Sequence, residues 1–239
     1  MLPQRNRAKR WEQWASSHLQ DGDLLFVQGE SRILLGLVDF SKLCTELADS
    51  QFSHIALVAR EQGQWVVYDT VLTGPRRTPF GQFMADRRVW KVAVKRLRPE
   101  YRARVPQAIA YCRQVVETGI AFDDDFRLNN DRLYCSELIE VAFRHGGIAL
   151  SEPIAINRLP GFDRVAKTTL RVVEAATSIE PEQKVIVPGN DRFGIWACPY
   201  LELVLPITDA SSPPESSGSR PGRPPTSQAR KDAPVGTAT

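Results

Sequence analysis

The sequence predicts an α+β fold in which a mainly antiparallel sheet or barrel packs against a helix that carries a cysteine. Strand-like segments rich in β-branched and aromatic residues cluster early in the chain, and helical patterns follow them. The pattern YCSEL at 134–138 opens a helix about eighty residues after the strand-like segment SHIALV at 53–58. A cysteine at a helix start and a histidine on a strand are the two parts of a thiolate–imidazolium pair.

Length and composition argue against a nucleic-acid-binding protein, a zinc module and a disulfide-rich domain. The chain has 239 residues, enough to bury a sizeable core, which favours one domain with short appendages. Its net charge of +3 is too small to indicate a nucleic-acid partner. The four cysteines, at positions 44, 112, 135 and 198, form no CxxC pair. We therefore expect no metal site, no cofactor and no disulfide framework.

Residues 1–19 are predicted to form an amphipathic helical appendage. The first ten residues are basic, but no apolar run follows them, and no stretch reaches the ~20 apolar residues of a membrane-spanning helix. A cytoplasmic location is therefore expected. Trp11 and Trp14 either dock on the domain, which we favour, or give the protein peripheral contact with a membrane.

Residues 208–239 are predicted to be a disordered tail, which leaves residues 20–207 as the folded domain. The tail is rich in Ser, Pro, Gly and Thr and has no aromatic residue, so it cannot bury enough apolar surface to offset the entropy of ordering. Its run RPGRPP at 220–225 could bind a partner as a polyproline-type ligand, although a simple spacer is favoured.

Strands are expected at 23–27, at 54–59 and 64–69 as a hairpin connected through Gly63, and at 89–97. Two short strands are expected at 184–188 and 201–204. Helical spacing predicts one helix within 31–47 and another from about Pro106 to Gly119. The long segment 70–88 is expected to be a loop, with a surface excursion favoured over a lid.

The helix that carries Cys135 can be predicted in more detail. Its N-cap is expected among residues 129–131 (NND), and the pair Gly146-Gly147 is expected to stop it. Cys135 then lies in the first turn, where backbone N–H groups and the helix dipole favour the thiolate. The other three cysteines fit the description of small core residues.

His54 is the candidate base. Of the other two histidines, His18 lies in the N-terminal appendage, and His145 lies at a helix C-terminus, where the dipole alone favours a cation. Asp69 closes the second strand of the hairpin, so it can lie opposite His54 and orient the imidazole. A solvated surface acid is the equal alternative for Asp69.

Four segments occur in an order that resembles the YiiX/YebB-like group: GDLLF at 22–26, FSHIALV at 52–58, VYD at 67–69 and DRLYCSELI at 131–139. This group comprises circularly permuted relatives of the NlpC-type papain-fold cysteine hydrolases, in which the cysteine helix follows the histidine strand instead of preceding it. KVIVPGN at 184–190 is also similar, so the resemblance covers about residues 20–192. It implies a permuted papain-like (NlpC-type) fold.

The resemblance also implies a triad with Cys135 as nucleophile, His54 as base and Asp69 as third member. Many relatives have Glu-Ala where this chain has Asp69-Thr70. The implied reaction is acyl transfer through a Cys135 thioester, with an amide in a peptide or an N-acyl compound as substrate. The backbone N–H of Cys135 is a candidate oxyanion donor. Three further residues are candidates for lining the site: Tyr134, Asp23 and Ser53.

Three alternatives stay open at this point. A related branch resembles lecithin:retinol acyltransferases and moves acyl chains between lipids; the apolar run at 33–38 could line its acyl groove, although an ordinary core helix is favoured. Cys135, His54 and a nearby acid could bind a metal, but they are a weak ligand set without short spacing. The third alternative is a non-catalytic binding module on the same fold, with the proline-rich tail recruiting a partner.

Overall fold

The computed structural model describes residues 2–33, 38–165 and 179–214. Its centre is a six-stranded sheet in the order β12-β7-β1-β4-β5-β6, and all neighbouring strands are antiparallel. The predicted α+β class with a mainly antiparallel sheet is therefore confirmed. The six strands are β1 (Leu24–Gly29), β4 (His54–Glu61), β5 (Gln64–Val71), β6 (Gly74–Pro79), β7 (Val89–Leu97) and β12 (Leu201–Asp209).

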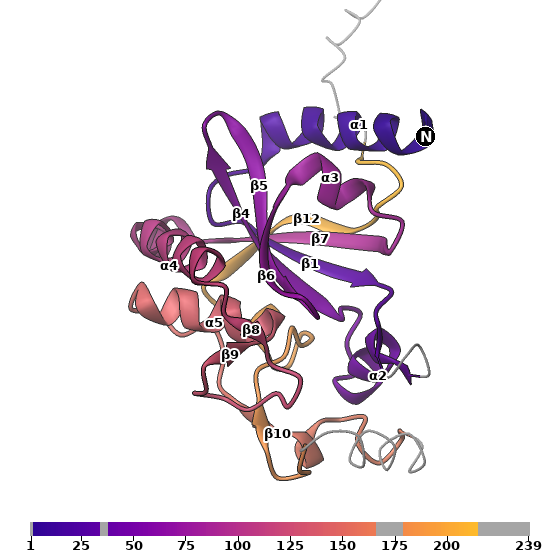
Figure 1. The fold of residues 1–239 in the computed structure, drawn as a ribbon, viewed down its shortest axis with the longest axis vertical. Helices are drawn as coiled ribbons and strands as arrows, with labels where there is room; N and C mark the ends of the chain where they lie inside the picture. Colours follow the sequence, from indigo (N-terminus) through magenta and orange to yellow (C-terminus); the bar gives the residue numbers. More distant parts are fainter. Residues whose placement is uncertain (1, 34–37, 166–178, 215–239) are drawn as a thin grey trace, which may run out of the picture.

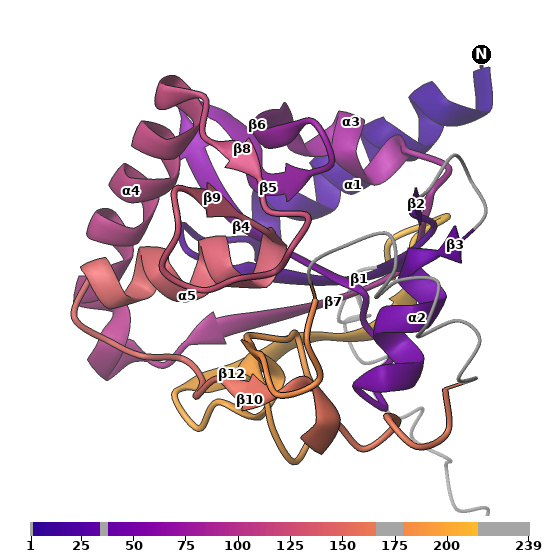
Figure 2. The ribbon, with the colours of Figure 1, turned by 60° about the horizontal axis from the view of Figure 1, so that its bottom comes forward.

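Helices cover both faces of this sheet (Figures 1 and 2). Side chains alternate between the faces along each strand. Leu25 and Val27 of β1 therefore join one apolar core, and Leu24 and Phe26 join the other. The first core also contains α1 (Leu2–His18) and α3 (Phe80–Ala85), and the second contains α4 (Val105–Thr118) and α5 (Cys135–His145).

The N-terminal helix α1 packs against α3. Trp11 and Trp14 are buried, and Trp11 makes an edge-on contact with Phe80. The indole Nε1 of Trp11 donates a hydrogen bond to the carbonyl of Ala210 at 2.8 Å. Ala210 follows β12 and is itself buried, so the ordered chain continues a few residues beyond the predicted boundary at 207. The rest of the predicted tail, from residue 215, lies outside the described residues.

The predicted hairpin is formed by β4 and β5, in which Glu61 pairs with Gln64. Gln62 and Gly63 both have positive φ, the conformation that a two-residue turn between twisted strands requires. The predicted helix from Pro106 to Gly119 is α4, and Gly119 ends it in the left-handed conformation. These expectations are confirmed.

The expected loop at 70–88 is wrong, because this segment forms β6 and α3. β6 is the edge strand of the sheet, and its sequence GPRRTP contains two prolines and no apolar alternation. Edge strands tolerate proline because one row of their N–H groups faces away from the sheet. A strand of this kind has no periodic signal in the sequence.

The helix expected within 31–47 is shorter than predicted. Asp39 caps α2 (Phe40–Leu47) by accepting from the backbone N–H of Lys42 at 3.0 Å. Residues 34–37 lie outside the described residues. The remaining elements are short: β2 (Arg32–Ile33) with β3 (Val38–Asp39), β8 (Ala121–Phe122) with β9 (Arg132–Leu133), β10 (Ile154–Ala155) with β11 (Lys184–Val185), and 3-10 turns at Pro99–Arg104, Ile156–Arg158 and Ile195–Ala197. Within the described ranges, no helix has the length and apolar character needed to cross a membrane.

Candidate active site

The cysteine helix α5 begins at Cys135, with Tyr134 as N-cap and without a capping side chain. The expected cap at 129–131 is therefore wrong. The start of the helix is held instead by a distant segment, because Ser136 Oγ donates to the carbonyl of Ile186 at 2.9 Å. The backbone N–H of Ile186 in turn donates to the Tyr134 hydroxyl at 2.7 Å. As the first helical residue, Cys135 keeps a backbone N–H that has no partner within the helix.

His54 is the first residue of β4 and lies against the start of α5. Burial alone would raise the pKa of Cys135, but the positive charge of His54 and the polar groups around the sulfur outweigh this effect and lower the pKa below the ordinary value. The structure thus favours the thiolate at Cys135.

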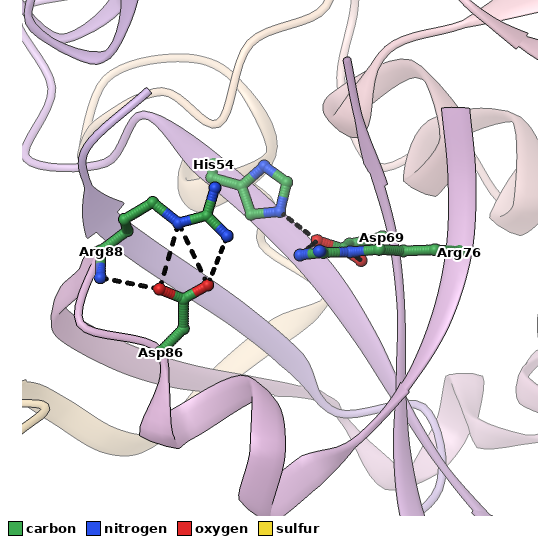
Figure 3. A network of polar contacts seen from close by, with 5 residues as sticks. All are labelled: His54, Asp69, Arg76, Asp86 and Arg88. Carbon is green, nitrogen blue, oxygen red and sulfur yellow. Dashed lines mark hydrogen bonds and ion pairs between the residues drawn. The ribbon is translucent and has the colours of Figure 1, made fainter. Parts of the chain in front are cut away.

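Asp69 lies beside the imidazole of His54 (Figure 3). His54 Nε2 donates to Asp69 Oδ2 at 2.9 Å, which leaves Nδ1 as the ring nitrogen for the thiol. The Asp69 carboxylate is fully buried, yet the bonds from His54 and Arg76 lower its pKa against the effect of burial. Burial would lower the pKa of His54, but Cys135 and Asp69 outweigh that effect and raise it. His54 therefore interacts with both other predicted residues: it is hydrogen-bonded to Asp69, and its charge interacts with that of Cys135.

Arg76 is part of this site and was missed by the sequence analysis. Its Nε and Nη2 atoms donate to the two oxygens of Asp69 at 2.8 and 3.0 Å (Figure 3). Asp69 on β5 pairs in register with Arg76 on β6, across a turn in which Val71 pairs with Gly74. If a two-residue turn at residues 72–73 had been assumed from the sequence, the resulting register would have placed Arg76 opposite Asp69. Arg88, which is paired with Asp86, adds further positive charge near Asp69.

An apolar cavity of about 130 Å³ opens beside the thiol. Ser53 and Tyr134, two of the candidate lining residues, lie on its wall together with Cys135. Asp23 does not reach this site. It immediately precedes β1, at the end of the strand away from His54. There it is fully buried and accepts two hydrogen bonds from Arg96 at 2.7 and 2.8 Å. Asp23 is therefore part of a structural ion pair.

Glu137, two residues after the cysteine, is also buried. Its Oε2 atom has no hydrogen-bond partner in the described part of the chain. Burial, followed by the nearby charge of Asp123, raises the pKa of Glu137 to about 8. Because the pKa is higher in the folded chain than in the unfolded chain, folding favours the protonated acid.

This shift predicts how stability depends on pH. The stability associated with Glu137 is greatest below about pH 4.5 and falls as the pH rises to about 8, where it levels off. We expect Glu137→Gln to remove this fall and to raise the thermal midpoint at pH 8 relative to pH 5. The matched control is Glu117→Gln on the exposed side of α4. Equal pH dependence in wild type and Glu137→Gln would contradict the expectation.

An antiparallel sheet that carries the histidine ahead of a cysteine helix defines the permuted papain-like class. The family model of the permuted papain-like amidase enzymes, the YaeF/YiiX C92 family, matches residues 18–182. The chain belongs to this family, so the resemblance and the permuted papain-like fold are confirmed. The match includes all of β1, β4, β5 and α5.

A solved structure shows the same fold. The crystal structure of the metalloprotein yiiX from Escherichia coli O157:H7 superposes with a TM-score of 0.63 and 20% identity, covering 78% of this chain and 97% of that chain. No curated protein matches the sequence.

The printed description calls that relative a metalloprotein, but the described residues at the candidate active site of this chain do not fit a metal ion. Within the described ranges, no group of three or more His, Cys, Asp or Glu side chains is arranged to hold a metal ion. Both oxygens of Asp69 already accept from Arg76, whose positive charge opposes a cation at this position.

Proposed function

We propose that this member of the family is a thiol amidase that cleaves an amide bond through a thioester on Cys135. Membership of a permuted papain-like amidase family supports a hydrolase in general. The observation that carries the finer proposal is that the His54 imidazole, hydrogen-bonded to Asp69, lies close enough to Cys135 for its charge to lower the pKa of the thiol. A lowered thiol pKa beside a raised imidazole pKa is the electrostatic state that an attacking thiolate requires.

In the first half-reaction, the Cys135 thiolate attacks the amide carbonyl carbon and forms a C–S bond. The backbone N–H of Cys135, the first residue of α5, is the group that we expect to stabilise the oxyanion that develops. When this intermediate collapses, the C–N bond breaks and His54 gives its proton to the leaving nitrogen. The products of this step are a free amine and a thioester.

In the second half-reaction, water gives a proton to His54 and its oxygen attacks the thioester carbonyl. Collapse breaks the C–S bond and releases a carboxylic acid, and the thiolate and imidazolium are restored. Asp69 holds Nε2–H throughout, which leaves Nδ1 as the ring nitrogen that exchanges protons with the reacting groups. Arg76 acts through Asp69 and is a positioning residue.

Trapping of the thioester tests the proposal. Incubation with p-nitrophenyl acetate should release one equivalent of p-nitrophenol rapidly and leave an acetyl group on the Cys135 peptide that hydroxylamine removes. His54→Ala should slow this acetylation by about 10² or more. The buried Cys112 serves as an internal control and should stay unmodified. An unacetylated Cys135, or acetylation at the same rate without His54, would contradict the proposal.

A further inference from the structure

Ser53 carries a hydroxyl group beside the reacting cysteine that the described part of the protein does not use. Ser53 and Cys135 lie on the wall of the same cavity, and Ser53 directly precedes His54 in the chain. The backbone N–H of Ser53 donates to the carbonyl of Val27 at 3.0 Å, which fixes the main chain at this point. The Ser53 side chain is half-buried, and its Oγ atom has no hydrogen-bond partner among residues 2–33, 38–165 and 179–214.

The other hydroxyl groups on this wall are already engaged in the protein. Ser136 Oγ donates to the Ile186 carbonyl, and the Tyr134 hydroxyl accepts from the Ile186 N–H. Among the described residues, no charged or amide side chain lines the cavity. Tyr134 and Ser136 therefore hold the start of α5, whereas the Ser53 hydroxyl can rotate toward a bound substrate.

The proposed reaction creates a negative charge next to the sulfur of Cys135. When the thiolate attacks, an electron pair of the carbonyl double bond moves to the oxygen and makes it an oxyanion. An oxyanion hole can combine a backbone N–H, here that of Cys135, with a donor from a side chain. In apolar surroundings such a hydrogen bond is electrostatically stronger than in water. A second donor on the wall that carries Cys135 would therefore stabilise the intermediate.

We propose, on the basis of the thiol amidase function, that Ser53 is a catalytic residue whose hydroxyl is the side-chain donor of the oxyanion hole. The hydroxyl donates a hydrogen bond to the oxyanion and keeps its proton, so all proton transfer stays with His54. When the intermediate collapses, the electron pair returns from the oxygen and re-forms the carbonyl. Loss of one such donor elsewhere lowers kcat by about 10² to 10³.

Two reactions at the same sulfur test this role. p-Nitrophenyl acetate acylates Cys135 through a tetrahedral oxyanion, whereas iodoacetamide alkylates it by displacing iodide from a saturated carbon, without an oxyanion. In Ser53→Ala, the single-turnover rate of acylation should fall by about 10² or more. The rate of alkylation and its pH dependence should stay at the wild-type values. Both modifications are followed on the Cys135 peptide by mass spectrometry.

Two further variants serve as matched controls. Ser53→Thr keeps a hydroxyl group at this position and should acylate faster than Ser53→Ala. Thr70→Val removes another hydroxyl that has no partner in the described part of the chain. Thr70 does not line the cavity, so Thr70→Val should acylate at the wild-type rate.

The outcomes separate the two proposals. Acylation of Ser53→Ala at the wild-type rate would overturn the role of Ser53 and leave the thiol amidase proposal standing. An equal fall in acylation and alkylation in the folded variant would mean that Ser53 only supports the thiolate, and it would also overturn that role. An absence of acylation in folded wild-type protein, with Cys135 intact, would overturn both proposals.

Discussion

Cys135→Ser is expected to reduce amide hydrolysis by about 10⁴-fold or more, because it removes the group that forms the covalent intermediate. A hydroxyl has a far higher pKa than a thiol, so His54 cannot keep it ionised near neutral pH. Because the thiolate is one of the charges that raise the pKa of His54, the imidazole should also titrate at a lower pH in this variant. NMR titration of the imidazole provides that second measurement.

The matched control is Cys112→Ala, because Cys112 is buried in the α4–α5 core and does not line the cavity. It should keep activity while losing some thermal stability. A Cys135→Ser variant that keeps more than a tenth of wild-type hydrolysis would contradict the assignment of the nucleophile.

Asp69→Asn is expected to have the second largest effect, because it removes the negative charge between His54 and Arg76. An amide cannot accept from His54 and from both Arg76 nitrogens at once. We expect kcat to fall by about 10² to 10⁴, as for the loss of an orienting carboxylate elsewhere. The pKa of His54 should fall, so the alkaline limb of the pH profile should move to lower pH.

The same substitution should also destabilise the fold. Removing one partner of a buried ion pair costs about 3–5 kcal/mol. Arg76 is 37% exposed and can be solvated, so we expect a smaller cost of about 2 kcal/mol. Asp69→Glu keeps the charge and should restore part of the activity and the position of the alkaline limb. A purely structural role for Asp69 would predict lower stability with an unchanged pH profile.

The elements that carry the three candidate residues could be predicted from the sequence, because each depends on a local pattern. A histidine at the start of a hairpin strand, an aspartate at the end of the next strand and a cysteine at a helix start can each be recognised within about ten residues. Their order along the chain then identified the permuted arrangement. In the structure His54 is hydrogen-bonded to Asp69 and lies close enough to Cys135 for the charges of the two side chains to interact.

The features that the sequence did not predict depend on contacts between distant segments. The start of α5 is held by hydrogen bonds to Ile186, about fifty residues away in the sequence. A prediction from local capping preferences therefore put the N-cap several residues too early. Arg76 lies on a proline-containing edge strand without apolar alternation, and its role follows only from its register with Asp69. Asp23 belongs to a motif of the resemblance, but its ion pair with Arg96 gives it a structural role.

The most direct test of the activated cysteine is the pH dependence of Cys135 alkylation by iodoacetamide, resolved by site with mass spectrometry, in wild type and His54→Ala. We predict a reactive pKa well below the ~8.5 of a free thiol in wild type and a higher value in His54→Ala. A Cys135 that reacts no faster than a free thiol at neutral pH, or whose reactive pKa is the same without His54, would contradict it.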